Sequence, residues 1–460
     1  MNPGLLIKLR PAGPWRIGPD SGARNQVDAI YHSDTLYAAV TSAMLRLGRL
    51  QDWLGATAAN GTPTLCFSSC FPFLAEIAFV VPPRTIWPPS SPALLSARVR
   101  WKSARFVPLG IVHGLLAGQP LDEDLWAVDG PSGCLVPAGR SGPFRLGLRF
   151  NAAVDRLTGT AERHSVACLE FRSGAGLWTV GRFADQEARD RWLDPLKTAF
   201  RLLADSGFGG ERSLGWGRSE MPEFIEGTFP EMILAPQAAS VPSPAVGLAL
   251  RAAAVDEVQA PEVAQAFPPA NIEEGQAPEL GPALAPAEGE QPTAQESSPT
   301  DEALPSADAA ELRGDPDVGR ALPPANVEQS QALPPIPDPI VPEPVPGSGP
   351  PAPHWLLSLF TPASTDAIDW TRGNYTVLIR SGRVEAPTRS GDLKRYLQMV
   401  AEGSVLYAAS DPRGSAPDVA PEGFAHPVFR AGFAVSILLP EMTGVGQGGQ
   451  STAPPAAKVS

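Results

Sequence analysis

The chain has 460 residues, of which 53 are Pro and 44 are Gly, so part of it is not expected to pack into a core. Only four Cys are present and none forms a C-x2-C pair, which excludes a disulfide-rich scaffold and argues against a structural zinc site. The formal charge of −13 argues, at first, against nucleic acid as a partner.

The acidic charge is concentrated in one segment. Residues Pro236–Pro353 contain 18 Asp and Glu, three Arg, no Lys and 25 Pro. The rest of the chain has 33 basic and 31 acidic residues and is close to neutral. The net charge therefore does not exclude RNA as a partner of the remaining parts.

Residues 1–235 show both strand and helix patterns. Strands are predicted at Leu5–Arg10, Thr64–Phe67, Ile77–Val81, Phe144–Phe150, Val166–Phe171 and Leu177–Gly181. A helix is predicted from Ser33, its expected N-cap, to about Leu47, and a second at about Gln186–Ala204. The most apolar stretch, Leu65–Val81, is interrupted by Pro72 and Glu76 and is not expected to span a membrane.

Residues 354–443 repeat this mixture of patterns. The predicted elements are strands at Trp355–Phe360, Tyr375–Ile379, Ser404–Ala408 and Phe433–Leu439, and a short helix at about Gly391–Ala401. We therefore predict an α+β protein with two ferredoxin-like (RRM-like) domains, 1–235 and 354–443. Residues 444–460 are expected to form a flexible tail.

The acidic segment 236–353 is predicted to be a disordered linker rich in Pro, Ala and Glu. Such a composition buries too little apolar surface to offset the entropy of ordering. An alternative is that it serves as a docking tail for a domain that reads Pro-rich sequences. The N-terminus, MNPGLLIKLRP, has no signal-peptide pattern, and the low Cys content fits a reducing cytoplasm.

A glycine-rich segment follows the second helix, with the sequence GFGGERSLGWG at 207–217. Glycine permits positive φ and close backbone approach, and exposed N–H groups could donate to phosphate oxygens. No Walker or dinucleotide-binding pattern is present. The predicted RNA-contacting residues here are Gly207, Gly209, Gly210, Arg212, Ser213, Gly215 and Gly217, and the alternative is an ordinary surface turn.

This segment and an ordered series of further motifs resemble one family. The motifs are YHSDTL at 31–36, FSSCFPF at 67–73, VPP at 81–83, WKSARFVPL at 101–109, VDRLTG at 154–159, GSVLY at 403–407 and HPVFRAG at 426–432. Together they resemble the Csm subunit four family, a RAMP-type subunit of type III-A CRISPR interference complexes. The resemblance covers residues 1–235 and 354–440, and the acidic linker departs from the family's compact form.

The resemblance implies a role without catalysis and without a cofactor. Subunits of this family hold the 5′ tag of the CRISPR guide RNA in antiviral defence. They pair with the large polymerase-type Cas subunit on one side and with the backbone RAMP subunit on the other. No DNA specificity of its own is expected, and a hairpin around Arg156 is expected to press on the guide RNA as RAMP thumbs do.

A basic, acid-free stretch agrees with an RNA-binding surface. Between Ile77 and Leu121 there is no Asp or Glu, and the basic residues include Arg98, Arg100, Lys102 and Arg105. Arg guanidinium groups suit phosphates, and Trp87 and Trp101 offer faces on which bases could stack. The alternative for each Arg is a solvated surface charge.

His32 supports a second hypothesis, a metal-independent endoribonuclease that processes the guide precursor. A histidine before the first helix could act as a general acid or base, but no second catalytic partner is evident. We expect instead that His32 orients the Ser33 cap or packs at a sheet edge. Asp34 is expected to interact with the helix dipole. A third hypothesis is an interaction protein organised by the Pro- and Glu-rich segment.

Overall fold

The computed structural model describes residues 2–18, 23–89, 101–154, 156, 159–234, 350–384 and 391–440. They belong to one compact unit, Met1–Val258 with Pro339–Ser460, while a second unit, Gln259–Asp338, lies outside the described residues. The predicted tail and most of the predicted linker also lie outside them. The sequence predicts a linker as far as Pro353, but a strand already begins at Ala352.

The N-terminal part is built on a seven-stranded sheet. Its strands are β1 (Asn2–Leu9), β2 (Leu65–Phe67), β3 (Phe71–Leu74), β4 (Ile77–Val80), β5 (Val107–Pro108), β10 (Ala175–Phe183) and β11 (Glu223–Phe229). The order is β11-β1-β10-β3-β4-β5, and β2 pairs with β10 beyond the end of β3. All of these pairings are antiparallel, and both β1 and β10 have a neighbouring strand on each side.

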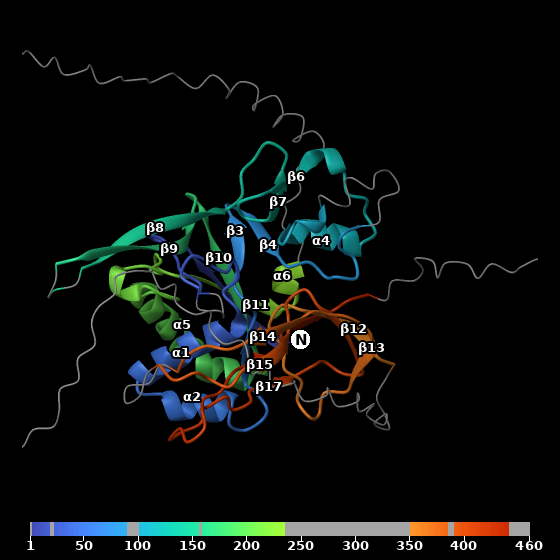
Figure 1. Ribbon diagram of the computed structural model, residues 1–460. Coiled ribbons are helices and arrows are strands. Elements are labelled where there is room, and N and C mark those ends of the chain that lie inside the picture. Colours follow the sequence, from blue (N-terminus) through green and yellow to red (C-terminus); the bar gives the residue numbers. More distant parts are fainter. Residues whose placement is uncertain are drawn as a thin grey trace, which may run out of the picture. The chain divides into compact units, whose positions relative to one another are not determined.

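Helices α1 (Ser33–Arg46) and α5 (Gln186–Ser206) pack side by side against this sheet (Figure 1). The side chain of Asp185 caps α5 by accepting a hydrogen bond of 2.8 Å from the Ala188 amide. The buried face of α5 contains Trp192, Leu196 and Phe200, which are four residues apart and therefore lie on one side of the helix. The remaining described α-helices are α2 (Leu50–Thr57), α4 (Leu109–Leu116) and α6 (Glu231–Leu234).

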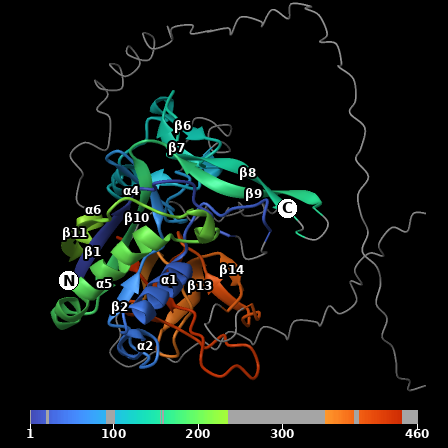
Figure 2. The ribbon, with the colours of Figure 1, turned by 90° about the vertical axis from the view of Figure 1, so that its left-hand side faces the viewer.

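Two hairpins connect these elements. One pairs β6 (Trp126–Asp129) with β7 (Cys134–Pro137), and the other pairs β8 (Phe144–Val154) with β9 (Ala161–Phe171) over their full length. Figure 2 shows that the β8–β9 hairpin extends away from the seven-stranded sheet. The hairpin predicted around Arg156 is therefore present, with longer strands than the sequence indicates.

The C-terminal part has a four-stranded antiparallel sheet of order β13-β16-β12-β19. Its strands are β12 (Ala352–Leu356), β13 (Ile368–Asn374), β16 (Val405–Ala408) and β19 (Ser436–Leu438). Two short ribbons join it, β14 (Val377–Arg380) with β15 (Leu397–Val400), and β17 (Gly414–Ser415) with β18 (Gly432–Phe433).

The helix predicted at Gly391–Ala401 is wrong. Residues 350–384 and 391–440 contain no helix, and Leu397–Val400 pairs with β14 instead. Met399 and Val400 are buried, and the Phe360 and Val400 amides exchange hydrogen bonds with each other's carbonyls. Tertiary strand pairing has overridden a short apolar pattern that also fits one helical turn.

The N-terminal and C-terminal parts share one hydrophobic core. Trp355, Leu357 and Val405 belong to the same buried cluster as Trp53 and Phe67. The Ser69 amide donates to the Leu357 carbonyl, and the Trp355 indole donates to the Val81 carbonyl. The described residues thus form an α+β protein with antiparallel sheets, as predicted. None of the helices in the described segments is long and apolar enough to cross a membrane.

Candidate nucleic-acid interface

The glycine-rich segment 207–217 forms a tight turn directly after α5. Gly207, Gly209, Gly215 and Gly217 all have φ between +73° and +92°, which glycine adopts without strain. A short 3-10 helix, Arg212–Leu214, lies at the tip of the turn. The side chains of Arg212 and Ser213 are exposed there, as contact with RNA requires.

The glycine amides of this turn are bonded within the chain. They donate from Gly207 to the Leu203 carbonyl, from Gly209 to the Tyr31 hydroxyl, from Gly210 to the Arg16 carbonyl, from Gly215 to the Arg212 carbonyl and from Gly217 to the Pro14 carbonyl. The expectation that these N–H groups are exposed for phosphate oxygens is therefore wrong, because an amide is a single donor. The tip of the turn, with Arg212 and Ser213, is the part that a phosphate could reach.

Close packing explains why most of these positions are glycine. A Cβ atom at Gly209 would clash with the Arg16 carbonyl oxygen, and one at Gly217 would clash with the Phe208 backbone. Gly215 differs, because nothing lies within 4 Å of the place where its Cβ would be. Gly215 is thus the position in the turn where surrounding space is left for a ligand.

The basic stretch before β5 is described only in part. Arg98 and Arg100 lie outside the described residues. Lys102 and Arg105 are exposed, but Arg105 is already engaged, since its Nη2 donates to Asp28 Oδ1 at 2.9 Å. The two tryptophans expected to stack on bases stack on each other, with ring centroids 5.6 Å apart and planes 7° apart. Trp101 is buried, so its face is not available to a base.

The β8–β9 hairpin bears an apolar face that the sequence analysis does not identify. Leu146, Leu148, Phe150 and Val154 alternate along β8 and are each more than half exposed. The guanidinium of Arg163, on β9, lies 3.9 Å from the centroid of the Phe150 ring. Alternation of apolar and polar residues from Phe144 onward is the signal that could have found this face. Arg156, at the tip of the hairpin, is exposed.

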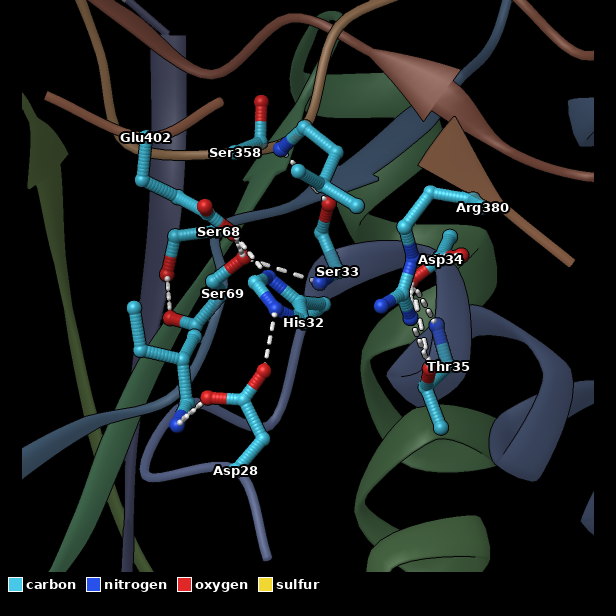
Figure 3. A network of polar contacts seen from close by, with 12 residues as sticks. Asp28, His32, Ser33, Asp34, Thr35, Ser68, Ser69, Ser358, Arg380 and Glu402 are labelled. Atoms are coloured by element: carbon cyan, nitrogen blue, oxygen red, sulfur yellow. Dashed lines mark hydrogen bonds and ion pairs between the residues drawn. The ribbon is translucent and has the colours of Figure 1, made fainter. Parts of the chain in front are cut away.

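His32 precedes α1 and lies inside a buried polar network (Figure 3). Its Nδ1 is 2.7 Å from Glu402 Oε1, and its Nε2 is 3.1 Å from Asp28 Oδ2. Burial opposes the charged imidazolium, but the charge of Glu402 and the hydrogen bonds to Asp28 and Glu402 outweigh it and raise the pKa of His32 to about 9. Ser69 Oγ also donates to Glu402.

This geometry does not suit a general base. Both ring nitrogens of His32 contact carboxylates, and only 3% of the residue is exposed. A base that accepts a proton from a ribose hydroxyl needs a nitrogen within hydrogen-bond reach of the substrate. The arrangement instead holds a protonated imidazolium between two carboxylates.

Asp34 is the second centre of the network. Its carboxylate accepts hydrogen bonds from Arg380, at 3.1 Å to each oxygen, and from Arg430. Burial favours the neutral acid, but the two guanidinium charges outweigh it and hold the pKa of Asp34 well below its usual range. Asp34 lies in the first turn of α1 as expected, but its contacts are dominated by these ion pairs rather than by the helix dipole.

Ser33 does not cap α1. The N-cap residue is His32, and its side chain makes no hydrogen bond to the amides of the first turn. Ser33 Oγ instead accepts a hydrogen bond from the Leu359 amide, and the Ser33 amide donates to Ser69 Oγ. The predicted capping role is therefore replaced by a contact with the C-terminal part, which no local sequence pattern indicates.

The described residues contain no group of three or more His, Cys, Asp or Glu side chains placed to hold a metal ion. The four cysteines are buried and unbridged.

The C-terminal part of the chain matches a known protein family. Residues 352–439 match the CRISPR Csm4 C-terminal domain. The C-terminal part of the chain is thus a domain of the Csm4 family. The match contains the GSVLY and HPVFRAG segments, and the family resemblance predicted from the sequence motifs is confirmed. No curated protein matches the sequence.

Solved structures containing Csm4 are similar at low identity. One is a Csm1–Csm4 cassette in complex with cA4, with 13% identity, a TM-score of 0.44, and coverage of 95% of this chain and 98% of that chain. Another is a Csm3–Csm4 subcomplex of the type III-A CRISPR–Cas interference complex, with 10% identity, a TM-score of 0.47, and coverage of 95% and 99%.

Proposed function

We propose that this chain is an RNA-binding subunit of a type III-A CRISPR effector complex that holds the 5′ tag of the guide RNA. The match of residues 352–439 to the Csm4 C-terminal domain is the observation that carries the proposal. Csm4 proteins are named in solved assemblies with Csm1 and with Csm3. The proposal extends these partners to this chain, as the large subunit and the backbone RAMP subunit.

Strand order supports RAMP-type, ferredoxin-like architecture in both parts. Numbered along the chain, the four central strands of a ferredoxin-like sheet lie in the order 4-1-3-2. The N-terminal order β11-β1-β10-β3 fits this scheme, and α1 and α5 occupy the two helix positions. The C-terminal order β19-β12-β16-β13 fits it too, with the β17–β18 ribbon between β16 and β19, where a ferredoxin-like fold has its second helix.

The surface at the tip of the glycine turn supports contact with RNA. Arg212 and Ser213 are exposed beside Gly215, where the backbone is open to an approaching ligand. Lys102 and Arg156 are also exposed, while Arg98 and Arg100 remain predictions. Forked Arg donors suit phosphate oxygens, so affinity is expected to fall with salt.

The proposed role is structural rather than catalytic. Endonuclease activity through His32 would require one of its nitrogens to leave a carboxylate and the residue to become exposed. Purified chain incubated with labelled repeat RNA and EDTA is expected to leave the RNA intact. Cleavage that is abolished in His32→Ala and retained in a control such as His426→Ala would favour the endoribonuclease hypothesis instead.

The central experiment is cross-linking of the assembled complex. The chain is co-expressed with its neighbouring subunits and a CRISPR array, the complex is irradiated, and RNA attached to this chain is sequenced. The proposal expects reads that begin in the repeat-derived tag. Reads spread evenly along the guide, or no RNA on this chain while a backbone subunit is labelled, would contradict it.

A further inference from the structure

A basic groove lies at the base of the β8–β9 hairpin, outside every residue assigned to RNA so far. It has a volume of about 470 Å³ and is lined by the loop Pro11–Pro14, by Phe171 and by the charged residues Arg145, Arg149, Glu170 and Arg172. Three guanidinium groups and one carboxylate leave a formal charge of +2 in the groove. Such an excess of donors over acceptors favours an anionic ligand.

Glu170 holds two of these arginines in a fixed relation. Glu170 Oε2 accepts from Arg145 Nε at 2.9 Å, and Glu170 Oε1 pairs with Arg149 Nη2 at 2.6 Å. The arginine side chains are 71% and 53% exposed, so the ion pairs add little to stability. The ion pairs instead orient the two guanidinium groups. Each group keeps further N–H donors that Glu170 does not use and that can bind a ligand.

Gly147 makes this arrangement possible. It lies on β8 midway between Arg145 and Arg149, and a Cβ atom there would be 2.8 Å from Glu170 Cδ and 2.9 Å from Glu170 Oε1. The glycine therefore leaves room for the carboxylate to lie between the two arginines. Its φ is not in the positive range, so turn geometry does not require glycine at this position.

The loop Pro11–Pro14, which lines the groove, is hydrogen-bonded to the end of the glycine turn. The Pro14 carbonyl accepts the Gly217 amide at 2.9 Å, and the Ala12 amide donates to the Arg218 carbonyl at 2.9 Å. The loop Pro11–Pro14 thus connects the groove to the segment that bears Arg212 and Ser213. An RNA backbone that contacts the turn can therefore continue into the groove.

We propose that Arg145 and Arg149, oriented by Glu170 over Gly147, bind a phosphodiester of the single-stranded RNA in this groove. The inference rests on the proposed function and deepens it by naming a second contact. Bidentate donation from a fixed guanidinium fits a phosphate, whereas a compact ammonium group would not give the same geometry. Glu170 acts as a positioning residue that does not contact the RNA.

The test measures binding of the full-length chain to a fluorescent single-stranded RNA that begins with the repeat-derived tag, over a series of salt concentrations. The double variant Arg145→Gln/Arg149→Gln is compared with Arg189→Gln/Arg191→Gln, which removes the same charge from the surface of α5. We expect the first to weaken binding about tenfold and the second to change it little. The slope of log affinity against log salt is expected to become shallower by about 0.7 for each phosphate that the variant no longer neutralises.

A second variant separates position from charge. Gly147→Ala keeps every charge but forces the Glu170 carboxylate to move, and it is expected to weaken binding several-fold at unchanged unfolding temperature. Gly130→Ala is its control, since nothing lies within 4 Å of the Cβ added there. Wild-type affinity in Gly147→Ala would overturn the positioning role of Glu170.

Other outcomes distinguish this inference from the proposed function. If wild-type chain binds the RNA and the double variant binds equally well, the groove is not an RNA site and the proposed function stands. If wild-type chain fails to bind, alone and in the assembled complex, both fail. If the double variant binds RNA normally but no longer co-purifies with a protein subunit, the groove holds an acidic protein segment and the inference is overturned.

Discussion

Asp34 and Arg380 form a buried ion pair across 346 positions of the sequence (Figure 3). Both carboxylate oxygens of Asp34 are engaged, and Arg430 donates to the same group. The first turn of α1 is thereby connected to β14 and to the segment before β18. Displacement of the C-terminal part would separate the aspartate from both arginines, so the contact makes the two parts depend on each other.

The first prediction concerns this ion pair. Asp34→Asn keeps the size of the side chain but leaves two buried guanidinium groups facing a neutral amide. Removal of one partner from a buried pair typically costs about 3–5 kcal/mol, and we expect a decrease of that size in the free energy of unfolding. Urea unfolding followed by tryptophan fluorescence measures it.

Asp52→Asn is the matched control. Asp52 is exposed in the first turn of α2, and its substitution is expected to change stability by less than about 0.5 kcal/mol. If Asp34→Asn and Asp52→Asn unfold at the same urea concentration, the ion pair does not hold the two parts together.

The second prediction is a decrease in stability at alkaline pH. The folded pKa of His32 is raised from 6.5 to about 9, so the unfolded state releases this proton first as the pH rises. His32 thereby contributes on the order of 3 kcal/mol to the free energy of unfolding. This contribution is fully present below about pH 6.5 and is lost as the pH rises through 9. Thermal unfolding between these pH values is expected to show the decrease.

His32→Gln removes the titrating group and is expected to flatten this part of the profile at a lower overall stability. His426→Gln, at an exposed site, is expected to leave the profile unchanged. The carboxylates behave oppositely, because the pKa values of Asp34 and Glu402 are lowered by their cationic neighbours, and their contribution disappears as the pH falls into the acid range. A wild-type profile as flat as that of His32→Gln would contradict the paired arrangement.

The sequence predicts local structure better than distant contacts. The helix predicted at about Gln186–Ala204 depends on nearby residues alone, and α5 at Gln186–Ser206 confirms it. The predicted Ser33 cap is wrong because the partners of Ser33 are the Leu359 amide and Ser69 Oγ, which no spacing rule connects to it. The Glu402 partner of His32 is beyond sequence reasoning for the same reason, since a single sequence shows no pairing between remote charges.

The third prediction separates two glycines of the turn. Gly209→Ala would place a Cβ against the Arg16 carbonyl oxygen and force φ of +73° on a residue that disfavours it. We expect stability to fall by about 2 kcal/mol or more. The measurement is the unfolding temperature of the purified chain.

Gly215→Asn is the companion variant. Asn tolerates positive φ better than other residues, and no atom lies within 4 Å of the added Cβ, so stability is expected to change by less than about 1 kcal/mol. If the tip of the turn contacts RNA, this variant weakens tag binding although the fold is intact. Normal RNA affinity in Gly215→Asn would remove the turn from the proposed interface.

The fourth prediction concerns the acidic segment, which stays a sequence prediction of a linker. Because the shared core and the Asp34 and His32 networks connect the described parts directly, residues 236–349 are not required to hold them together. Replacing them with about 30 residues of Gly and Ser shortens the connecting loop roughly fourfold. Because each halving of a loop lowers the entropic cost of closing it by about 0.6 kcal/mol, we expect the free energy of unfolding to rise by about 1 kcal/mol. Urea unfolding and co-purification with the neighbouring subunits measure the two consequences. Retained stability without co-purification would show that the acidic segment itself binds a partner, and would favour the hypothesis of an interaction protein over that of a passive linker.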